Sequence, residues 1–327
     1  MLPETDRMPD QQAIAAAYQA AKERWLLAPL PGAGVVRLSG PDRLQFLSRL
    51  STQNLDDLAP GAWRTSLLLN ALGRLVDRLT VVAESDQLLL LTSPSRAELV
   101  RQWLAGYIFF QDDVAVAAEA SDWQQWALLG PEADSQVGRW EPTLVRSPLG
   151  RVAQLESGYL WRDETPADGW RLLGRGPWNA ATAAESGIAA AAAAWEALRV
   201  EGGLPAPRHE LRPDLTPLEI GLRAAISFDK GCYIGQEIIA RMDSRGQVPR
   251  GLWRLRLEGP ADPEAEILQS GKTVGMLTSV AWSPASGWIA LGLIQRRAVG
   301  DGPPSGLALS DGSRVEPWQA VAGPASA

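Results

Sequence analysis

Cysteine and histidine are almost absent from this chain of 327 residues, which contains one of each, Cys232 and His209. One cysteine cannot form a disulfide within the chain, so we expect a reducing compartment or one in which disulfides are not used. A zinc site built from cysteine and histidine takes about four such ligands. These shortages exclude an internally disulfide-bonded fold and a Cys/His metal centre supplied by this chain alone.

The chain also lacks long hydrophobic runs and an excess of positive charge. No apolar stretch reaches the roughly 18–20 residues that a membrane span requires, and the opening MLPETDRMPD is unlike a secretory signal. The net charge of −7 argues against broad electrostatic binding of nucleic acid. We therefore expect a cytoplasmic protein with no membrane contact and no direct nucleic-acid partner.

Lysine is the third scarce residue, because only three of the 31 basic residues are lysines. The remainder are arginines, and ten basic residues fall within residues 199–256. Two interpretations of this stretch stay open. The arginines are either solvated surface groups or the lining of a pocket for a polyanionic small molecule.

What is present is a pattern of mixed helices and strands followed by an all-β region. Apolar periodicity predicts helices over 10–25, from about 41, over 96–106 and over 188–200, and strands over 35–38, 62–70, 73–83, 87–92 and from 126. After residue 251, short alternating segments separated by Gly and Pro predict a small β-module. We expect an N-terminal region of two α+β subdomains over 1–250 and a β-barrel over 251–327.

One short segment, FDKGCYIGQEIIAR (228–241), collects the rare residues Lys230 and Cys232 between glycines. If a helix begins near Gly235, Cys232 precedes a helix N-terminus, and both that terminus and the Lys230 cation favour the thiolate. The thiolate is the form that acts as nucleophile or metal ligand. The alternative is that Cys232 is a small buried hydrophobic residue, as free cysteines often are.

A second candidate is Asp77, in the predicted strand NALGRLVDRL (70–79). If Asp77 shares a face with Leu75 and Leu79, a carboxylate lies among leucines and needs partners. The other interpretation buries Val76 and turns Asp77 toward solvent. The pattern alone leaves both open.

Several segments in order resemble one protein family. DKGCYIGQE (229–237) is similar to the signature of the YgfZ-type folate-binding proteins, which are relatives of the glycine-cleavage T-protein, the aminomethyltransferase. Further similarity covers most of the chain, in LSGPDRLQFL (38–47), LLLNALGRLVDRL (67–79), LRVEGGLP (198–205), TPLEIGL (216–222), GMLTSVAWSP (275–284) and IALGLI (289–294).

The resemblance implies an α+β ring of three subdomains with a C-terminal β-barrel and tetrahydrofolate in the central hole. A carboxylate would accept the pterin donors bidentately, arginines would meet the anionic glutamate tail, and an aromatic ring such as Trp195 would stack on the pterin. Cys232 and Lys230 are then the candidate reactive groups. The candidate folate-binding residues are Asp77, Arg199, Glu201, Arg223, Tyr233 and Gln236.

The chain departs from the aminomethyltransferase pattern in two places, one of which is the cysteine of KGCYIGQE, which the transferase lacks. That enzyme's YTGEDG segment is matched here by ETPADGW (164–170), with Ala167 where the folate-holding Glu stands. Both departures favour a folate-dependent accessory factor that works with iron–sulfur client or assembly proteins, and only indirectly in tRNA modification. We expect a monomer, because a ring of subdomains buries its own interfaces. Two alternatives remain, a folate-dependent aminomethyl- or methyltransferase and a non-catalytic interaction module marked by exposed indoles.

Overall fold

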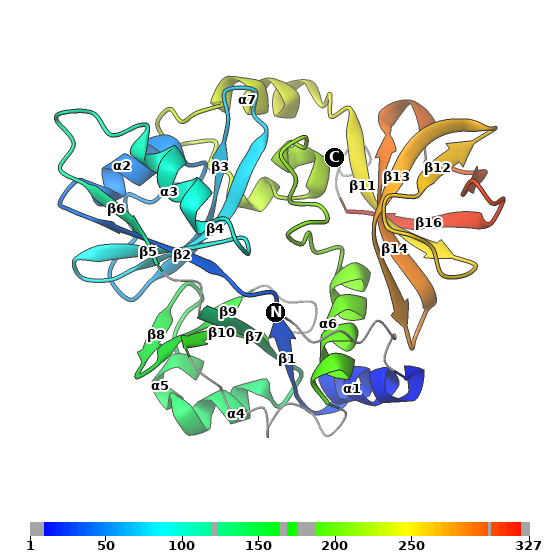
Figure 1. Cartoon of the computed structure of the whole chain (residues 1–327), viewed down its shortest axis with the longest axis horizontal. Helices are drawn as coiled ribbons and strands as arrows, with labels where there is room; N and C mark the ends of the chain where they lie inside the picture. The colour runs from blue at the N-terminus through cyan, green and yellow to red at the C-terminus, as the bar shows by residue number, and fades with distance from the viewer. Residues whose placement is uncertain (1–9, 120–122, 164–168, 176–186, 300–301, 322–327) are drawn as a thin grey trace.

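A computed structural model describes residues 10–119, 123–163, 169–175, 187–299 and 302–321. Its strands form two five-stranded sheets and a closed six-stranded barrel. The alanine-rich helix α6 (Ile188–Gly202) lies between the barrel and the sheet that contains β1 and β7 (Figure 1). This arrangement confirms the predicted α+β ring with a C-terminal β-barrel.

The first sheet has the strand order β3-β4-β5-β2-β6, and every neighbouring pair is antiparallel. Helices α2 and α3 pack on it through buried apolar side chains such as Phe46, Leu47 and Val100. The bounds of these elements are β2 (Gly34–Ser39), α2 (Arg43–Leu50), β3 (Trp63–Leu69), β4 (Leu75–Ala83), β5 (Gln87–Thr92), α3 (Ala97–Ala105) and β6 (Ala115–Ala118).

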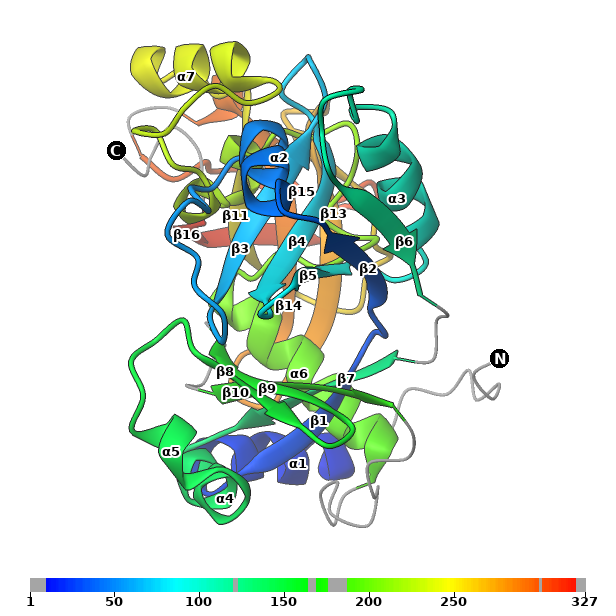
Figure 2. The same ribbon diagram turned by 90° about the vertical axis from the view of Figure 1, so that its left-hand side faces the viewer.

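The second sheet has the order β1-β7-β10-β9-β8 and lies below the first in Figure 2. Helices α1, α4 and α5 surround it on the side away from the first sheet (Figure 2). The bounds are α1 (Gln11–Glu23), β1 (Leu26–Leu30), β7 (Trp123–Leu129), α4 (Ala133–Trp140), α5 (Pro142–Val145), β8 (Val152–Leu155), β9 (Gly158–Asp163) and β10 (Gly169–Arg175).

The barrel closes in the order β11-β14-β13-β12-β15-β16, with β16 pairing back onto β11. Its interior holds a separate apolar cluster that includes Trp253, Leu255 and Ile294. The bounds are β11 (Arg250–Leu257), β12 (Glu266–Gln269), β13 (Lys272–Ser283), β14 (Gly287–Gln295), η4 (Arg296–Ala298), β15 (Leu307–Ala308) and β16 (Arg314–Ala320). The first barrel strand begins at Arg250, and the division of the chain at residues 250/251 into two domains stays a prediction.

Helix α6 joins the three parts because small side chains let it approach its neighbours closely. Ala191, Ala194 and Ala197 are fully buried and belong to one cluster with residues of β1, β3, β7 and the barrel. The helix ends at Gly203, whose left-handed φ of +70° suits glycine. Among the described residues, no helix is both long enough and apolar enough to cross a membrane.

Between α6 and the barrel, the chain passes through two short 3-10 helices and one α-helix. These are η2 (Pro217–Ile220), η3 (Arg223–Ala225) and α7 (Gln236–Arg245). The motif segment 228–235 is the loop that connects η3 to α7. The predicted helix start near residue 235 is therefore confirmed, and α7 lies at the end of the β3–β4 hairpin (Figures 1 and 2).

Candidate functional site

Cys232 lies in the loop before α7, and its side chain is exposed and free. The interpretation of this cysteine as a buried hydrophobic residue is therefore wrong. Gly235 sets the end of the loop, since its φ of +82° is left-handed and a Cβ there would lie 2.6 Å from the carbonyl oxygen of Asn70. The loop thus closes tightly against the β3–β4 hairpin while presenting the thiol to solvent.

Lys230 anchors the same loop to the C-terminal end of α2. Its Nζ donates hydrogen bonds to the backbone oxygens of Ser51 at 2.8 Å and Gln53 at 2.9 Å, and also to that of Ser48. These carbonyls follow or end the last helical turn, where a cation is favourable. Burial nevertheless lowers the pKa of Lys230 to about 8, an effect that Asp56 partly opposes. In this structure Lys230 positions the loop that carries Cys232.

The aromatic residue of the motif lies beneath the loop. Tyr233 is buried in the main apolar cluster, and the Lys230 ammonium lies 5.7 Å from its ring centroid. Burial raises the pKa of Tyr233 to about 12. Gln236 is the first residue of α7 and is half-buried. The motif thus combines one exposed thiol with residues that hold its loop in place.

Asp77 lies in β4 and is 2% exposed, on the same side as Leu75 and Leu79. The interpretation that placed it among leucines is therefore correct, and the one that turned it to solvent is wrong. Its carboxylate accepts hydrogen bonds from the Ser93 hydroxyl at 2.6 Å and from the Ser93 amide at 3.1 Å. Burial raises its pKa in spite of those bonds and of Arg96, whose Nε lies 3.9 Å away.

The donor count limits how Asp77 can meet a pterin. Its Oδ1 accepts from the Arg78 amide and from the Ser93 hydroxyl, which uses both lone pairs, whereas Oδ2 accepts one hydrogen bond, from the Ser93 amide. One further donor fits at Oδ2 without displacing a bond. The carboxylate therefore suits a single pterin donor better than the expected bidentate pair.

Arg199 and Glu201 lie on α6 where it meets the barrel. The Arg199 guanidinium is 2% exposed and contacts Glu196, Glu210 and the Ser279 hydroxyl. Its donors are thus all taken by the protein. Glu201 accepts from the Tyr18 hydroxyl at 2.8 Å and from the Ser283 hydroxyl. The structure gives both residues a role in joining α6 to its neighbours, and their predicted part in folate binding stays a prediction.

Of the two arginines predicted to bind folate, Arg223 is the accessible one. Its side chain is 64% exposed, its Nε lies 2.9 Å from Asp243 on α7, and its guanidinium covers the Phe228 ring at 4.7 Å. It therefore flanks the loop of Cys232. The Trp195 indole, in contrast, is buried, and the Arg171 guanidinium lies 4.6 Å from its ring centroid. One side of Trp195 is thus already occupied.

Arg78 and Arg171 were missed by the sequence reasoning. Both lie in strands and lack a hydrogen-bond partner for a buried Nε in the part of the chain that the structure describes. The signal that could have found Arg78 is strand alternation, because burial of Asp77 turns its neighbour to the opposite face of β4. Ala167, the predicted departure from the transferase pattern, lies outside the described residues.

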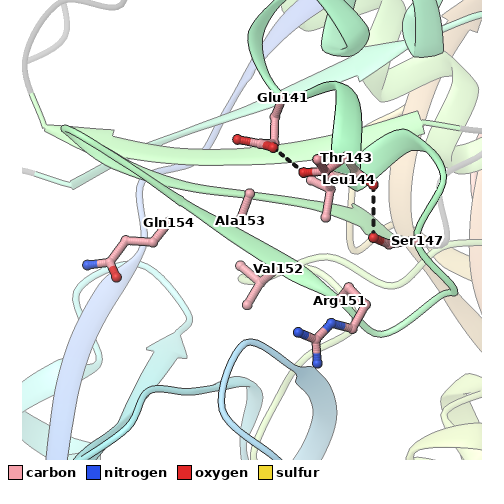
Figure 3. A pocket seen from close by; sticks show the side chains of 8 residues that line it. All are labelled: Glu141, Thr143, Leu144, Ser147, Arg151, Val152, Ala153 and Gln154. Atoms are coloured by element: carbon pink, nitrogen blue, oxygen red, sulfur yellow. Dashed lines mark hydrogen bonds between the residues drawn. The ribbon is translucent and has the colours of Figure 1, made fainter.

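An open cavity of about 270 Å³ lies elsewhere, beside α5 and β8 (Figure 3). Its polar lining residues include the charged side chains of Glu141 and Arg151, the hydroxyl of Ser147 and the amide of Gln154 (Figure 3). None of the predicted site residues lines it. The cavity is thus separate from the Cys232 loop and from Asp77.

Three comparisons place the chain among known proteins. Residues 5–147 match the family described as the GCVT N-terminal domain. A chloroplastic protein of Arabidopsis thaliana named "Putative transferase" is 32% identical over 82% of this chain, and the chain spans 65% of its length. An aminomethyltransferase of Desulfitobacterium hafniense is 27% identical over 88% of this chain and 83% of its own.

The fold itself matches a solved structure. The glycine cleavage system aminomethyltransferase T from Bartonella henselae superimposes with a TM-score of 0.79, covering 95% of this chain and 88% of that one. The sequence identity is 19%, so this match concerns the fold.

Proposed function

Because the chain carries a GCVT N-terminal domain and is related to the glycine-cleavage aminomethyltransferases, we propose that it is a YgfZ-type tetrahydrofolate-binding protein whose working group is the Cys232 thiol. In this proposal it supports the assembly or repair of iron–sulfur enzymes in the cytoplasm. Effects on tRNA modification follow indirectly, through such enzymes.

The observation that carries the proposal is the exposure of Cys232 on an anchored loop. The side chain is free, Lys230 fixes the loop to three carbonyls at and just after the C-terminal end of α2, and Gly235 closes it against a hairpin. A cysteine kept only for packing would be buried. A thiol held outward by such specific contacts is suited to reaction with a partner.

A single thiolate limits the chemistry that the site can perform. An iron–sulfur cluster takes about four thiolate ligands, so Cys232 would need ligands from a client protein or from small thiols. Three roles remain compatible with one exposed thiol: a transient cluster ligand, a redox thiol, or an acceptor of a one-carbon unit. All three require access from solvent, which Cys232 has.

Two observations support the binding of folate: the similarity to the aminomethyltransferases and the buried carboxylate of Asp77. The residue offers a buried acceptor at Oδ2 for one pterin donor, and a buried hydrogen bond of this kind would fix the orientation of the ring. When bound, tetrahydrofolate would supply the one-carbon chemistry of the site. Asp77 would hold the ring, and Arg223 is the accessible cation for the glutamate tail.

A complementation experiment tests the proposal. In cells that lack the native copy, we expect wild type and Ser244→Ala to restore the activity of iron–sulfur enzymes, and Cys232→Ala to fail at equal protein level. Ser244 is the control because it lies on the exposed side of the neighbouring α7. Full restoration by Cys232→Ala would refute the role of the thiol.

The second candidate is a folate-dependent aminomethyl- or methyltransferase, which the names of the relatives favour. A turnover assay with a lipoylated carrier and tetrahydrofolate separates it from the first. Product formation at more than the uncatalysed rate would support transfer. The interaction-module alternative has less support, since Trp140 is the one exposed indole in the described ranges.

A further inference from the structure

The first and second sheets face one another through an aromatic contact. Trp63 of β3 and Trp161 of β9 lie with ring centroids 6.2 Å apart, within a cluster that also includes Val82 of β4 and Leu173 of β10. Side chains on these facing surfaces are therefore withdrawn from solvent. Any polar group among them needs a partner.

Two arginines extend into this interface, one from each sheet. Arg171 of β10 lies directly opposite Trp161 of β9 in the antiparallel register, so the two side chains share a face. Arg78 of β4 follows Asp77 and, by strand alternation, lies on the same face as Val82. Asp77 therefore belongs to the other face of β4, and the arginines form a separate site.

The two guanidiniums extend from facing surfaces of the two sheets, and Arg171 responds to the charge of Arg78. Burial lowers the pKa of Arg171, nearby Asp163 opposes that effect, and the positive charge of Arg78 lowers the pKa further. Asp163 lies 3.3 Å from the Arg171 Nε, and both side chains are largely buried. The Arg171 guanidinium thus has Asp163 as its ion-pair partner in a poorly solvated space.

The same interface contains donors without acceptors. In the described part of the chain, no hydrogen bond is made by the buried Nε of Arg78 or by the indole Nε1 of Trp63 and Trp161, and the Arg171 Nε has its ion pair with Asp163. Trp161 is 2% exposed, so water does not reach it readily. These three unsatisfied donors, together with two guanidiniums and one carboxylate, favour a ligand that is negatively charged and rich in hydrogen-bond acceptors.

We propose that the facing surfaces of the two sheets bind an oxyanion, a carboxylate or a phosphate, between Arg78 and Arg171. Arg171 is held for this task from both sides, by the Asp163 carboxylate and by the Trp195 ring at 4.6 Å. Arg78 supplies the second guanidinium from the other sheet. The site uses neither Asp77 nor Cys232, and it shares with the expected folate site only the Trp195 ring, which Arg171 covers.

The test is a thermal-shift and calorimetric titration of the full chain with sodium phosphate and with glutarate. Sodium chloride at equal ionic strength is the reference. We expect a saturable rise in Tm over chloride with at least one of the two oxyanions, and the stronger one identifies the source of the charge. We expect the apparent Kd to weaken about tenfold in Arg78→Met. Arg314→Met, on the exposed surface of the barrel, should bind like wild type.

A second readout separates a binding role from a structural one. Removing one of two adjacent like charges relieves repulsion, so the ligand-free Arg78→Met should melt at the same temperature as wild type or higher. Arg171→Lys keeps the charge but loses the planar fork, and should also weaken oxyanion affinity. A lower Tm of ligand-free Arg78→Met with unchanged oxyanion affinity would overturn the proposal.

Including tetrahydrofolate distinguishes this proposal from the proposed function. Oxyanion binding without tetrahydrofolate binding would support the arginine site and refute the folate role. Tetrahydrofolate binding that is equal in wild type and Arg78→Met, with no response to phosphate or glutarate, would overturn the arginine site and leave the folate role standing.

Discussion

At the residue scale, the buried charge of Asp77 connects stability with pH. Its pKa is raised in the folded protein because burial disfavours the carboxylate more than Ser93 and Arg96 favour it. The folded state therefore binds a proton more tightly than the unfolded state, and the resulting stability is fully present below the unfolded pKa of about 3.9. It is lost as the pH rises through the raised folded value.

This sign gives a prediction for Asp77→Asn. As the pH falls from 7 toward 4, the free energy of unfolding of wild type should rise relative to that of Asp77→Asn. The reason is that only wild type can bind a proton at this position. Urea denaturation at a series of pH values measures the difference. A difference that is constant with pH, or one of opposite slope, would contradict the account of a desolvated carboxylate.

Lys230 gives a second prediction at this scale. Lys230→Met removes a charged donor from three carbonyls at the end of α2 and should lower the free energy of unfolding by roughly 1.5–3 kcal/mol. Lys272→Met, at an exposed position on the barrel, is the matched control and should change it little. Equal effects of the two substitutions would show that the Lys230 contacts contribute nothing specific.

At the element scale, the loop 228–235 depends on two glycines in different ways. Gly235 has a left-handed φ and no room for a Cβ, whereas a Cβ at Gly231 would meet nothing within 4 Å. We expect Gly235→Ala to destabilise the protein by about 1–2 kcal/mol or more, and Gly231→Ala to be near neutral. The rate of thiol labelling of Cys232 should differ from wild type in Gly235→Ala and be unchanged in Gly231→Ala. Unchanged stability and labelling in both variants would refute the anchoring of the loop.

The elements themselves were largely predictable from the sequence. The strands around residues 62–83, the alanine-rich helix and the helix after Gly235 follow from local periodicity and glycine placement, and they appear where expected. The face of β4 was not predictable, because Val76 and Asp77 alternate and either could be inward. The hydrogen bonds from Ser93 and the Arg78 amide, with Arg96 nearby, explain why the carboxylate can be the buried side chain.

At the scale of the whole molecule, contacts between distant segments carry what the sequence could not indicate. Lys230 donates a hydrogen bond to the carbonyl of Ser51, far earlier in the chain. Arg171 lies opposite Trp161 because of the register in which β10 pairs with β9. The resemblance supplied the ring fold, but it gave no reason to expect Arg199 in a buried ion pair. The candidate residues of the cysteine motif lie together in one loop and at the start of α7. Asp77, in β4, and Arg199 and Glu201, in α6, lie in other elements.

The joint between α6 and the barrel gives a prediction at this scale. Arg199→Met would leave Glu210 fully buried without its cation, and such a loss typically costs about 3–5 kcal/mol. Arg314→Met removes an exposed ion pair and should cost less than about 1 kcal/mol. Denaturation followed by tryptophan fluorescence measures both. A small effect of Arg199→Met would mean that the buried pair does not hold the barrel to α6.

The central claim is that this chain binds tetrahydrofolate at Asp77 and reacts through Cys232. The most direct measurement is a calorimetric titration of tetrahydrofolate into wild type, Asp77→Asn and Cys232→Ala. The account predicts binding to wild type, about tenfold or greater weakening in Asp77→Asn, and undiminished binding to Cys232→Ala. Absence of binding to wild type would contradict it, as would equal affinity of all three proteins.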